Sequence, residues 1–424
     1  MTVGSTPAHM QGLTLVNSEE QSPADTIAQQ SSKDTIDSGE LNQRLWWCHT
    51  SDMLHQMLLT AGYSGPRVCQ YLKMFQSDIV PSAGPCTLDH GKGIFKHALT
   101  GMGALEFLLK FRSSMATVRI ALEPTSDLAG TNDDPCNKIR LREVLHDFKA
   151  RPGFEDLDLE LSEQLRNFLV VSDSEIRQLQ SQNRLQGLPS WTQHILLMDL
   201  RQDQHKIETE MLLYPMVKAT ALGVPVLDMI FAAIREVDTK SRYGAAVNLL
   251  EDYLSSTRST TLGGLMLSCD LVPSSQARIR VVVYETRFNV DRAAELWTLG
   301  GQLTSSENTT GLEMLRKLFM ILGPEIANLK EGVPMMFTYE LSPCNPRPWP
   351  TVTLPLLGIN DRTACNYVAA ILKELGWDNH AKTYTDRLAS FAPGRSLDSM
   401  TEFQAFLFFS FCEESGPSLE IAFH

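Results

Sequence analysis

The sequence predicts an α+β fold in which ten antiparallel strands close into a barrel, surrounded by a ring of about ten helices. The first observation is a repeated unit: segments of helical periodicity and segments rich in apolar and β-branched residues follow as helix, helix, strand, strand, five times. The second is size, because 424 residues with 43% hydrophobic content can bury a large core. Consecutive hairpins tend to close, since closure removes exposed edges, and a barrel of more than about eight strands can hold a ligand.

The chain begins with a segment that cannot form part of this core. Residues 1–40 are rich in Ser, Thr, Gln, Gly and Asp and nearly free of aromatic residues, so we expect a disordered tail followed by one domain over 41–424. The first helix shows apolar residues at helical spacing, among them Leu45 and Trp46, and it ends before Gly62. The five units comprise helices over 43–59, 65–77, 139–149, 160–182, 215–235, 242–255, 290–298, 310–322, 361–375 and 380–390, and strands over 104–111, 117–123, 192–200, 207–214, 264–270, 278–284, 335–341, 351–357, 404–411 and 418–423.

Composition excludes several classes of protein. The net charge of −13 argues against a nucleic acid or an anionic membrane as partner, because both attract basic surfaces. No stretch reaches the roughly 18 apolar residues of a membrane span, and the longest candidate, 221–234, is interrupted by Pro225 and Asp228. Eight scattered cysteines without a CxxC pair, and no evident signal peptide, favour a cytoplasmic protein with reduced thiols.

The sequence predicts no metal and no cofactor. The ten histidines show no HExxH or similar spacing. Asp133-Asp134-Pro135 is not a DDxxD magnesium motif, and the surrounding residues indicate a loop. There is no glycine-rich phosphate loop and no GxSxG motif.

A carboxylate lies inside the apolar strand at 104–111. Burying an unpaired carboxylate costs several kcal/mol, so Glu106 has either a fixed cationic partner or a chemical role. We interpret Glu106 as the catalytic base. The alternative is a structural partner of Lys110 or of Arg119 on the next strand.

Three arginines lie on predicted strands. Arg119 belongs to the strand after that of Glu106, and Arg278 and Arg280 share one face of the strand at 278–284. They are either solvated surface residues or lumen residues. We favour the lumen, because alternation in long apolar strands directs them to one face of the barrel.

A series of segments after about residue 40 resembles the fungal dimethylallyltryptophan synthase type of aromatic prenyltransferases. Their order and spacing together, more than any single segment, carry the resemblance. The segments are Gln43-Arg44-Leu45-Trp46-Trp47, Leu58-Leu59-Thr60-Ala61-Gly62-Tyr63, Val80-Pro81-Ser82-Ala83-Gly84-Pro85, Leu197-Met198-Asp199-Leu200, Tyr214-Pro215-Met216-Val217-Lys218-Ala219, Leu267-Ser268-Cys269-Asp270, Ala277-Arg278-Ile279-Arg280, Leu299-Gly300-Gly301, Ile359-Asn360-Asp361 and Glu374-Leu375-Gly376-Trp377.

The resemblance implies a prenyltransferase (ABBA) barrel and metal-independent transfer of a prenyl group from dimethylallyl or a longer allylic diphosphate to an indole-like aromatic acceptor. It implies that Glu106 contacts the acceptor. Arg119 matches a diphosphate-binding arginine, Arg280 stands where a diphosphate-binding lysine is usual, and Arg278 lies two residues earlier. We expect a monomer or a homodimer.

The chain departs from the family pattern at the implied donor site. Glu210 replaces a lysine four residues before Tyr214-Pro215. If Tyr214 faces the lumen, Glu210 does too, and it then requires Arg119, Arg278 or Arg280 as a partner. Tyrosine positions of the family are occupied by Leu212, Val282, Thr353, Phe406 and Phe423.

Three functions are consistent with this pattern. The first is an aromatic prenyltransferase of fungal secondary metabolism, supported by the fold, Glu106 and the three arginines. The second is a cyclase or pericyclase-like enzyme on the same barrel, acting on a preformed isoprenoid or alkaloid, which Glu210 and the missing tyrosines favour. The third is a non-catalytic binder of a hydrophobic metabolite. No carboxylate clamp for an amino acid is evident, so free tryptophan is not the expected acceptor.

Overall fold

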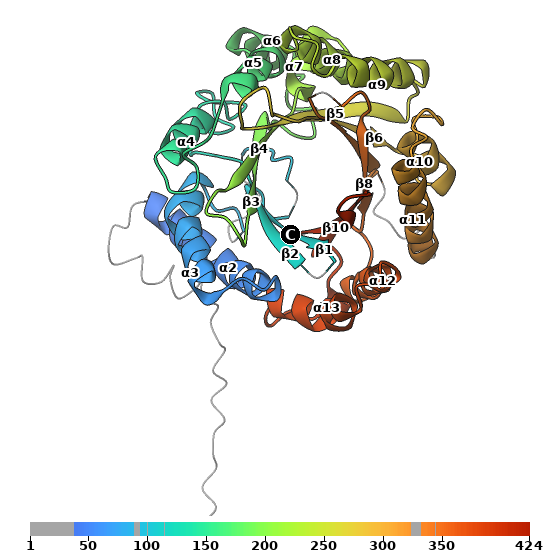
Figure 1. Cartoon of the computed structure of the whole chain (residues 1–424). Helices are drawn as coiled ribbons and strands as arrows, with labels where there is room; N and C mark the ends of the chain where they lie inside the picture. The colour runs from blue at the N-terminus through green and yellow to red at the C-terminus, as the bar shows by residue number, and fades with distance from the viewer. Residues whose placement is uncertain (1–37, 89–93, 100, 114, 324–331, 344) are drawn as a thin grey trace, which may run out of the picture.

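The ten strands form one closed antiparallel barrel, as predicted. The computed structural model describes residues 38–424 except 89–93, 100, 114, 324–331 and 344. Each strand pairs with its neighbours in the chain, and β1 pairs with β10 to complete the circle (Figure 1). The strands are β1 (Leu105–Arg112), β2 (Met115–Leu122), β3 (His194–Leu200), β4 (Glu208–Leu213), β5 (Leu262–Asp270), β6 (Ile279–Glu285), β7 (Met335–Leu341), β8 (Trp349–Pro355), β9 (Gln404–Cys412) and β10 (Gly416–Phe423).

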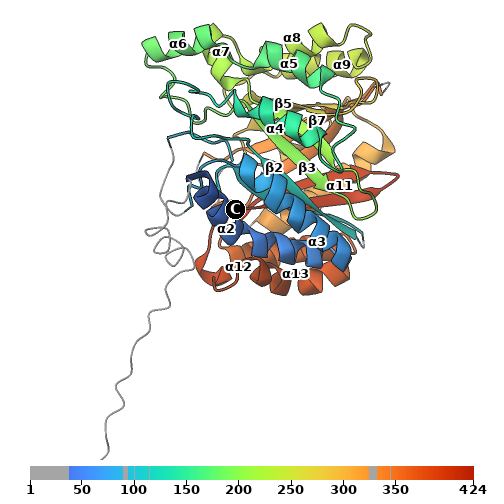
Figure 2. The ribbon, with the colours of Figure 1, turned by 90° about the vertical axis from the view of Figure 1, so that its left-hand side faces the viewer.

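Helices surround the barrel on all sides (Figures 1 and 2). In the last unit α13 packs against α2 of the first, so the helical ring closes where the two ends of the barrel sheet meet. The described α-helices are α2 (Ser38–Thr60), α3 (Gly65–Met74), α4 (Arg140–Lys149), α5 (Glu160–Leu169), α6 (Asp173–Ser181), α7 (Met216–Leu222), α8 (Val226–Val237), α9 (Gly244–Ser256), α10 (Val290–Trp297), α11 (Ser306–Leu322), α12 (Asp361–Glu374) and α13 (Asp378–Phe391).

Two segments predicted as single helices are each two helices. Segment 160–182 breaks before α6, where Ser172 and Glu175 form a capping box that starts a new helix. Segment 215–235 breaks at Gly223, which ends α7 with φ of +70°, a conformation that glycine adopts without strain. Pro225 then precedes α8.

The alternation of side chains along the strands creates the lumen. On β7 the outward Phe337 and Tyr339 are fully buried beneath the helices, whereas the intervening residues are partly exposed toward the barrel interior. β4 shows the same alternation. The outer face of the barrel therefore belongs to the hydrophobic core, and the inner face is accessible to a ligand.

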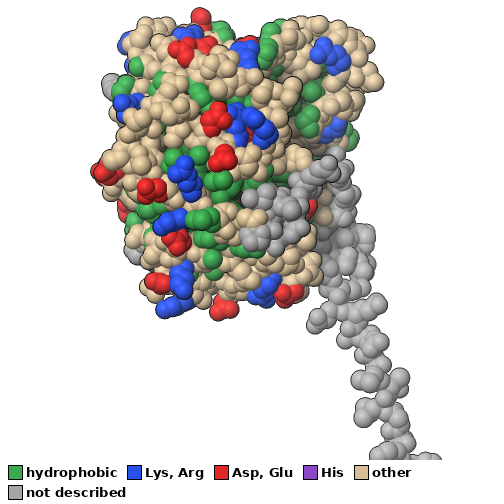
Figure 3. Space-filling model, turned by 90° about the vertical axis from the view of Figure 1, so that its right-hand side faces the viewer, with side chains coloured by type: hydrophobic (Ala, Val, Ile, Leu, Met, Phe, Trp, Pro, Cys, Tyr) green, Lys and Arg blue, Asp and Glu red, His purple; other side chains and the backbone are tan. Residues whose placement is uncertain are grey.

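Of the predicted tail, residues 1–37 lie outside the described part of the chain, and Ser38 begins α2. Among the described residues no single helix is long and apolar enough to cross a membrane; α7 and α8 meet that test only as a pair, bent by 103°. The described cysteines form no disulfide. On the face drawn in Figure 3, acidic and basic side chains are interspersed.

Candidate active site

A belt of charged side chains lines the lumen, and we call it the charged ring. Strand register brings its members together: Lys110 lies opposite Glu420, Arg119 opposite Asp199, Glu210 opposite Asp270, and Arg280 opposite Glu340. Arg278 adjoins the ring just before β6 and is 44% exposed. The ring comprises Lys110, Arg119, Asp199, Glu210, Asp270, Arg278, Arg280, Glu340 and Glu420.

Arg119 is held by three carboxylates. Its Nε donates to Asp199, and its Nη1 donates to both oxygens of Glu420 at 2.9 and 3.1 Å. Its Nη2 lies 3.6 Å from Oε2 of Glu210. The guanidinium is thus surrounded by acceptors from β3, β4 and β10.

Arg280 repeats this arrangement across the lumen. Its Nη1 lies 2.8 Å from Oδ1 of Asp270 and 3.3 Å from Oε1 of Glu210, and its Nε donates to Glu340 at 3.0 Å. Arg278 donates from Nε to Asp270 at 2.6 Å. Glu210 therefore bridges Arg119 and Arg280, two of the three partners that the sequence offered it. Ser268 donates a hydrogen bond to the same carboxylate.

The ring carries no net positive charge. It holds four cationic and five acidic side chains. Burial acts to lower the pKa of Arg119, but Asp199, Glu420 and Glu210 outweigh it and hold that pKa above its ordinary value. Burial acts to raise the pKa of Asp199, but Arg119 and Lys110 hold it below its ordinary value. Both partners therefore stay ionised at neutral pH.

An apolar patch adjoins the ring inside the lumen. Leu108, Ala121 and Ala422 are buried there, and the aromatic rings of Phe406 and Phe408 pack against them. The remaining members of this cluster are Ala98, Leu99, Ile195, Leu197, Leu212 and Tyr214. The patch offers a water-poor surface of the kind that a hydrophobic substrate requires.

Beyond this patch, Glu106 forms a pair with a residue that the sequence did not single out. Oε1 of Glu106 lies 2.8 Å from Nε2 of His424, and both side chains are largely buried. The sequence suggested Lys110 or Arg119 as a structural partner of Glu106, and this prediction is wrong. Arg119 binds Asp199, Glu210 and Glu420 instead. Glu106 precedes Lys110 by four residues, about 13 Å along a strand. The two sites therefore lie at different depths in the lumen.

The backbone around His424 fixes its imidazole against Glu106. Its amide donates to the carbonyl of Phe403 at 3.0 Å, and its ring packs edge to face on Phe406. Gly101 has a φ of +81°, and a Cβ there would lie 2.3 Å from Cβ of His424. Only glycine leaves room for this histidine without a rearrangement.

Tyr214 and a second carboxylate lie near Glu106. Burial raises the pKa of the Tyr214 phenol, and Glu123 and Glu106 raise it further, so the phenol keeps its proton. Glu123 is fully buried and accepts hydrogen bonds at Oε2 from Thr192 and pairs there with His97 at 2.8 Å. This end of the lumen therefore combines two carboxylates with a protonated phenol.

Thr353 lies on the lumen face of β8, between Met336 and Phe408 in register, and is 1% exposed. Tyr284 faces the same interior from β6, two residues after Val282, and its ring covers Gly263. No group of three or more His, Cys, Asp or Glu side chains suited to hold a metal occurs in the part of the chain that the structure describes.

Sequence reasoning missed Asp199, Asp270, Glu340, Glu420 and His424. Each lies on a predicted strand or directly after one, at a position that the alternation of side chains directs into the lumen. This alternation could have identified them as lumen residues. The contacts themselves depended on the register between strands, which the sequence does not supply.

The chain is similar to proteins of one enzyme family, both in sequence and in structure. A family model described as tryptophan dimethylallyltransferase matches residues 42–387. The prenyltransferase malB of Malbranchea aurantiaca is 34% identical, over 82% of this chain and 95% of that protein. The roquefortine prenyltransferase roqD of Penicillium rubens is 33% identical, over 91% and 92%. The solved structure of NotF in complex with brevianamide F and DMSPP matches with a TM-score of 0.81 and 27% identity, covering 95% of this chain and 98% of that one.

Proposed function

The chain belongs to the tryptophan dimethylallyltransferase family and is an aromatic prenyltransferase, and on this premise we propose how its lumen works. The donor is dimethylallyl or a longer allylic diphosphate, and the acceptor is an indole-like aromatic compound. The observation that carries the proposal is the order of groups along the lumen: arginines, then an apolar aromatic patch, then Glu106 held by His424. NotF, whose solved complex contains DMSPP and brevianamide F, supports this choice of donor and acceptor.

The chemistry follows from that order. The allylic carbon–oxygen bond breaks and its electron pair leaves with the diphosphate. An electron-rich carbon of the acceptor then forms a bond to the allylic cation, and the proton that the acceptor loses passes to the carboxylate of Glu106. Phe406 and Phe408 belong to this apolar patch, so they shield the cation from water, and aromatic rings at this place can stabilise it. Glu106 accepts a hydrogen bond from the acceptor N–H and makes the ring more nucleophilic.

Binding of the diphosphate donor requires that ion pairs within the charged ring be broken. Arg119 and Arg280 can bind a diphosphate only by releasing carboxylates that they now contact. Because those carboxylates remain nearby, they repel the incoming anion. This observation favours, as a second candidate, a cyclase or pericyclase-like enzyme whose substrate carries no diphosphate. The choice between the two depends on Glu210.

We extend the proposal to a cytoplasmic location, which the scattered cysteines without a CxxC pair support. We also propose a monomer or a homodimer. Light scattering on the purified chain distinguishes the two.

Prenyl transfer is expected to continue in the presence of a chelator. The described residues contain no cluster of side chains suited to hold a metal. The cations of the charged ring therefore take the place of a metal at the donor position. The test measures diphosphate release with and without excess EDTA, and again after magnesium is added back. Loss of turnover that magnesium alone restores would contradict this mechanism.

His424→Leu is expected to lower kcat about tenfold or more with little change in KM for the donor, because the imidazole orients the carboxylate of Glu106. His424→Gln keeps a hydrogen-bond donor at a similar reach and should recover most of kcat. Equal activities of the Leu and Gln variants would show that His424 only fills space.

A further inference from the structure

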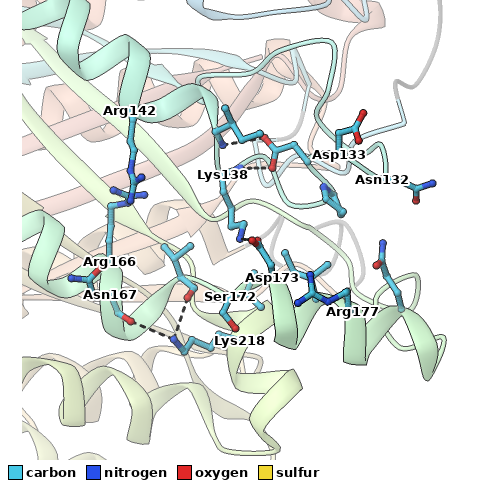
Figure 4. A pocket seen from close by; sticks show the side chains of 17 residues that line it. Asn132, Asp133, Lys138, Arg142, Arg166, Asn167, Ser172, Asp173, Arg177 and Lys218 are labelled. Carbon is cyan, nitrogen blue, oxygen red and sulfur yellow. Dashed lines mark hydrogen bonds and ion pairs between the residues drawn. The ribbon is translucent and has the colours of Figure 1, made fainter.

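A second cavity lies outside the barrel. It has a volume of about 650 Å³, is open to the surface, and is lined by α4, α5, α6, α7 and the loop that precedes α4 (Figure 4). Ile139, Val170, Val171 and Ile176 give it an apolar surface. Its charged lining comprises the basic residues Lys138, Arg142, Arg166, Arg177 and Lys218 and the acidic residues Asp133, Asp134 and Asp173.

Several of these charges are already engaged by the protein. Lys138 pairs with Asp173, and Lys218 donates to the carbonyl groups of Asn167 and Val170. Asp134 accepts the backbone amides of Lys138 and Ile139. The first turn of α6 is satisfied by its own capping box. These groups shape the cavity and are not available to a ligand.

Three arginines remain with unused donors. The side chains of Arg142 and Arg177 form no hydrogen bond or ion pair with another residue in the described part of the chain, although the charge of Arg177 helps to lower the pKa of Asp173. Arg166 is only 7% exposed, and its Nη1 binds Glu163, yet its Nε is buried without an acceptor. In Figure 4, Arg142 and Arg166 extend toward one another from α4 and α5.

We propose that this cavity binds a small organic molecule through an oxyanion, a phosphate or a carboxylate, placed between Arg142 and Arg166. Two guanidinium groups that face each other repel unless an anion lies between them, and their planar donors match oxyanions in bidentate geometry. Nη2 of Arg166 donates to no other residue in the described part of the chain and can donate to such a ligand. The organic part of the ligand packs on Val170 and Ile176. The site is independent of the lumen and of prenyl transfer.

The test is calorimetric titration of the full chain with inorganic phosphate, isopentenyl monophosphate and benzoate. Arg142→Leu is expected to weaken binding of the preferred oxyanion at least tenfold, and Arg177→Leu to weaken it less. Arg316→Leu on α11 is the matched control, since Arg316 is exposed and also has no ion pair among the described residues. It should leave the affinity unchanged.

Tighter binding of the two phosphates than of benzoate would identify a phosphate as the anionic group, and the reverse would identify a carboxylate. Stronger binding of isopentenyl monophosphate than of inorganic phosphate would support contact of the organic part with Val170 and Ile176. Binding that Arg142→Leu leaves intact would locate the anion elsewhere and overturn the proposal. Failure of all three probes to bind the unaltered chain would overturn it as well. Thermal denaturation of each variant confirms that the fold is retained.

Discussion

Glu106→Gln is expected to lower turnover with an allylic diphosphate and an indole acceptor by about a hundredfold or more. The change keeps the size of the side chain and a hydrogen-bond acceptor, but removes the negative charge that allows Glu106 to take a proton from the acceptor. Glutamine can still contact His424, so the fold should persist. Steady-state kinetics with dimethylallyl diphosphate and a panel of indoles measures the loss, and circular dichroism checks the fold.

Glu208→Gln is the matched control for this prediction. Glu208 lies on β4 at the far end of the lumen, its side chain is 43% exposed, and the substitution removes the same charge. Its turnover should stay within a few-fold of the unaltered chain. A Glu106→Gln variant as active as this control would reduce Glu106 to a structural partner of His424.

The barrel could be predicted from the sequence because its signals are local. Alternation along one strand identifies the inward face, so Arg119 and Glu210 could be assigned to the lumen from their own segments. Helix breaks depended on weaker local signals. Ser172 and Glu175 have capping-box spacing, but the helical periodicity on both sides concealed the break.

The pairing of the charges could not be predicted, because the partners are distant in the sequence. Arg119 contacts Asp199 and Glu420, which are 80 and 301 positions away. Glu106 and His424 are 318 positions apart and meet only because β1 pairs with β10. The apolar residues around Glu106 indicate that this carboxylate needs a partner. Which residue is that partner depends on the register between β1 and β10 in the closed barrel.

Glu210→Lys is expected to tighten the binding of an allylic diphosphate at least tenfold. Glu210 lies between Arg119 and Arg280, so the change removes the carboxylate that both now contact and adds a cation beside them. The ring then holds five cations and four carboxylates in place of four and five. At an effective dielectric constant of about 20, each unit of charge about 6 Å from a phosphate contributes on the order of 2–3 kcal/mol. Titration calorimetry with a non-hydrolysable donor analogue measures the gain.

Two controls separate the position of this charge from its sign. Glu374→Lys makes the same change on α12, outside the barrel, and should alter donor affinity little, because its side chain is 41% exposed and exposed charges are screened. Glu210→Gln removes the negative charge without adding a positive one and should fall between Glu210→Lys and the unaltered chain. If Glu210→Lys still binds no diphosphate and loses its native reaction, the charged ring serves a substrate without a diphosphate. In that case the substitution removes the carboxylate that Arg119 and Arg280 share and gives nothing in return. Tighter donor binding with retained prenyl transfer would instead establish that Glu210 limits a donor site that the barrel still uses.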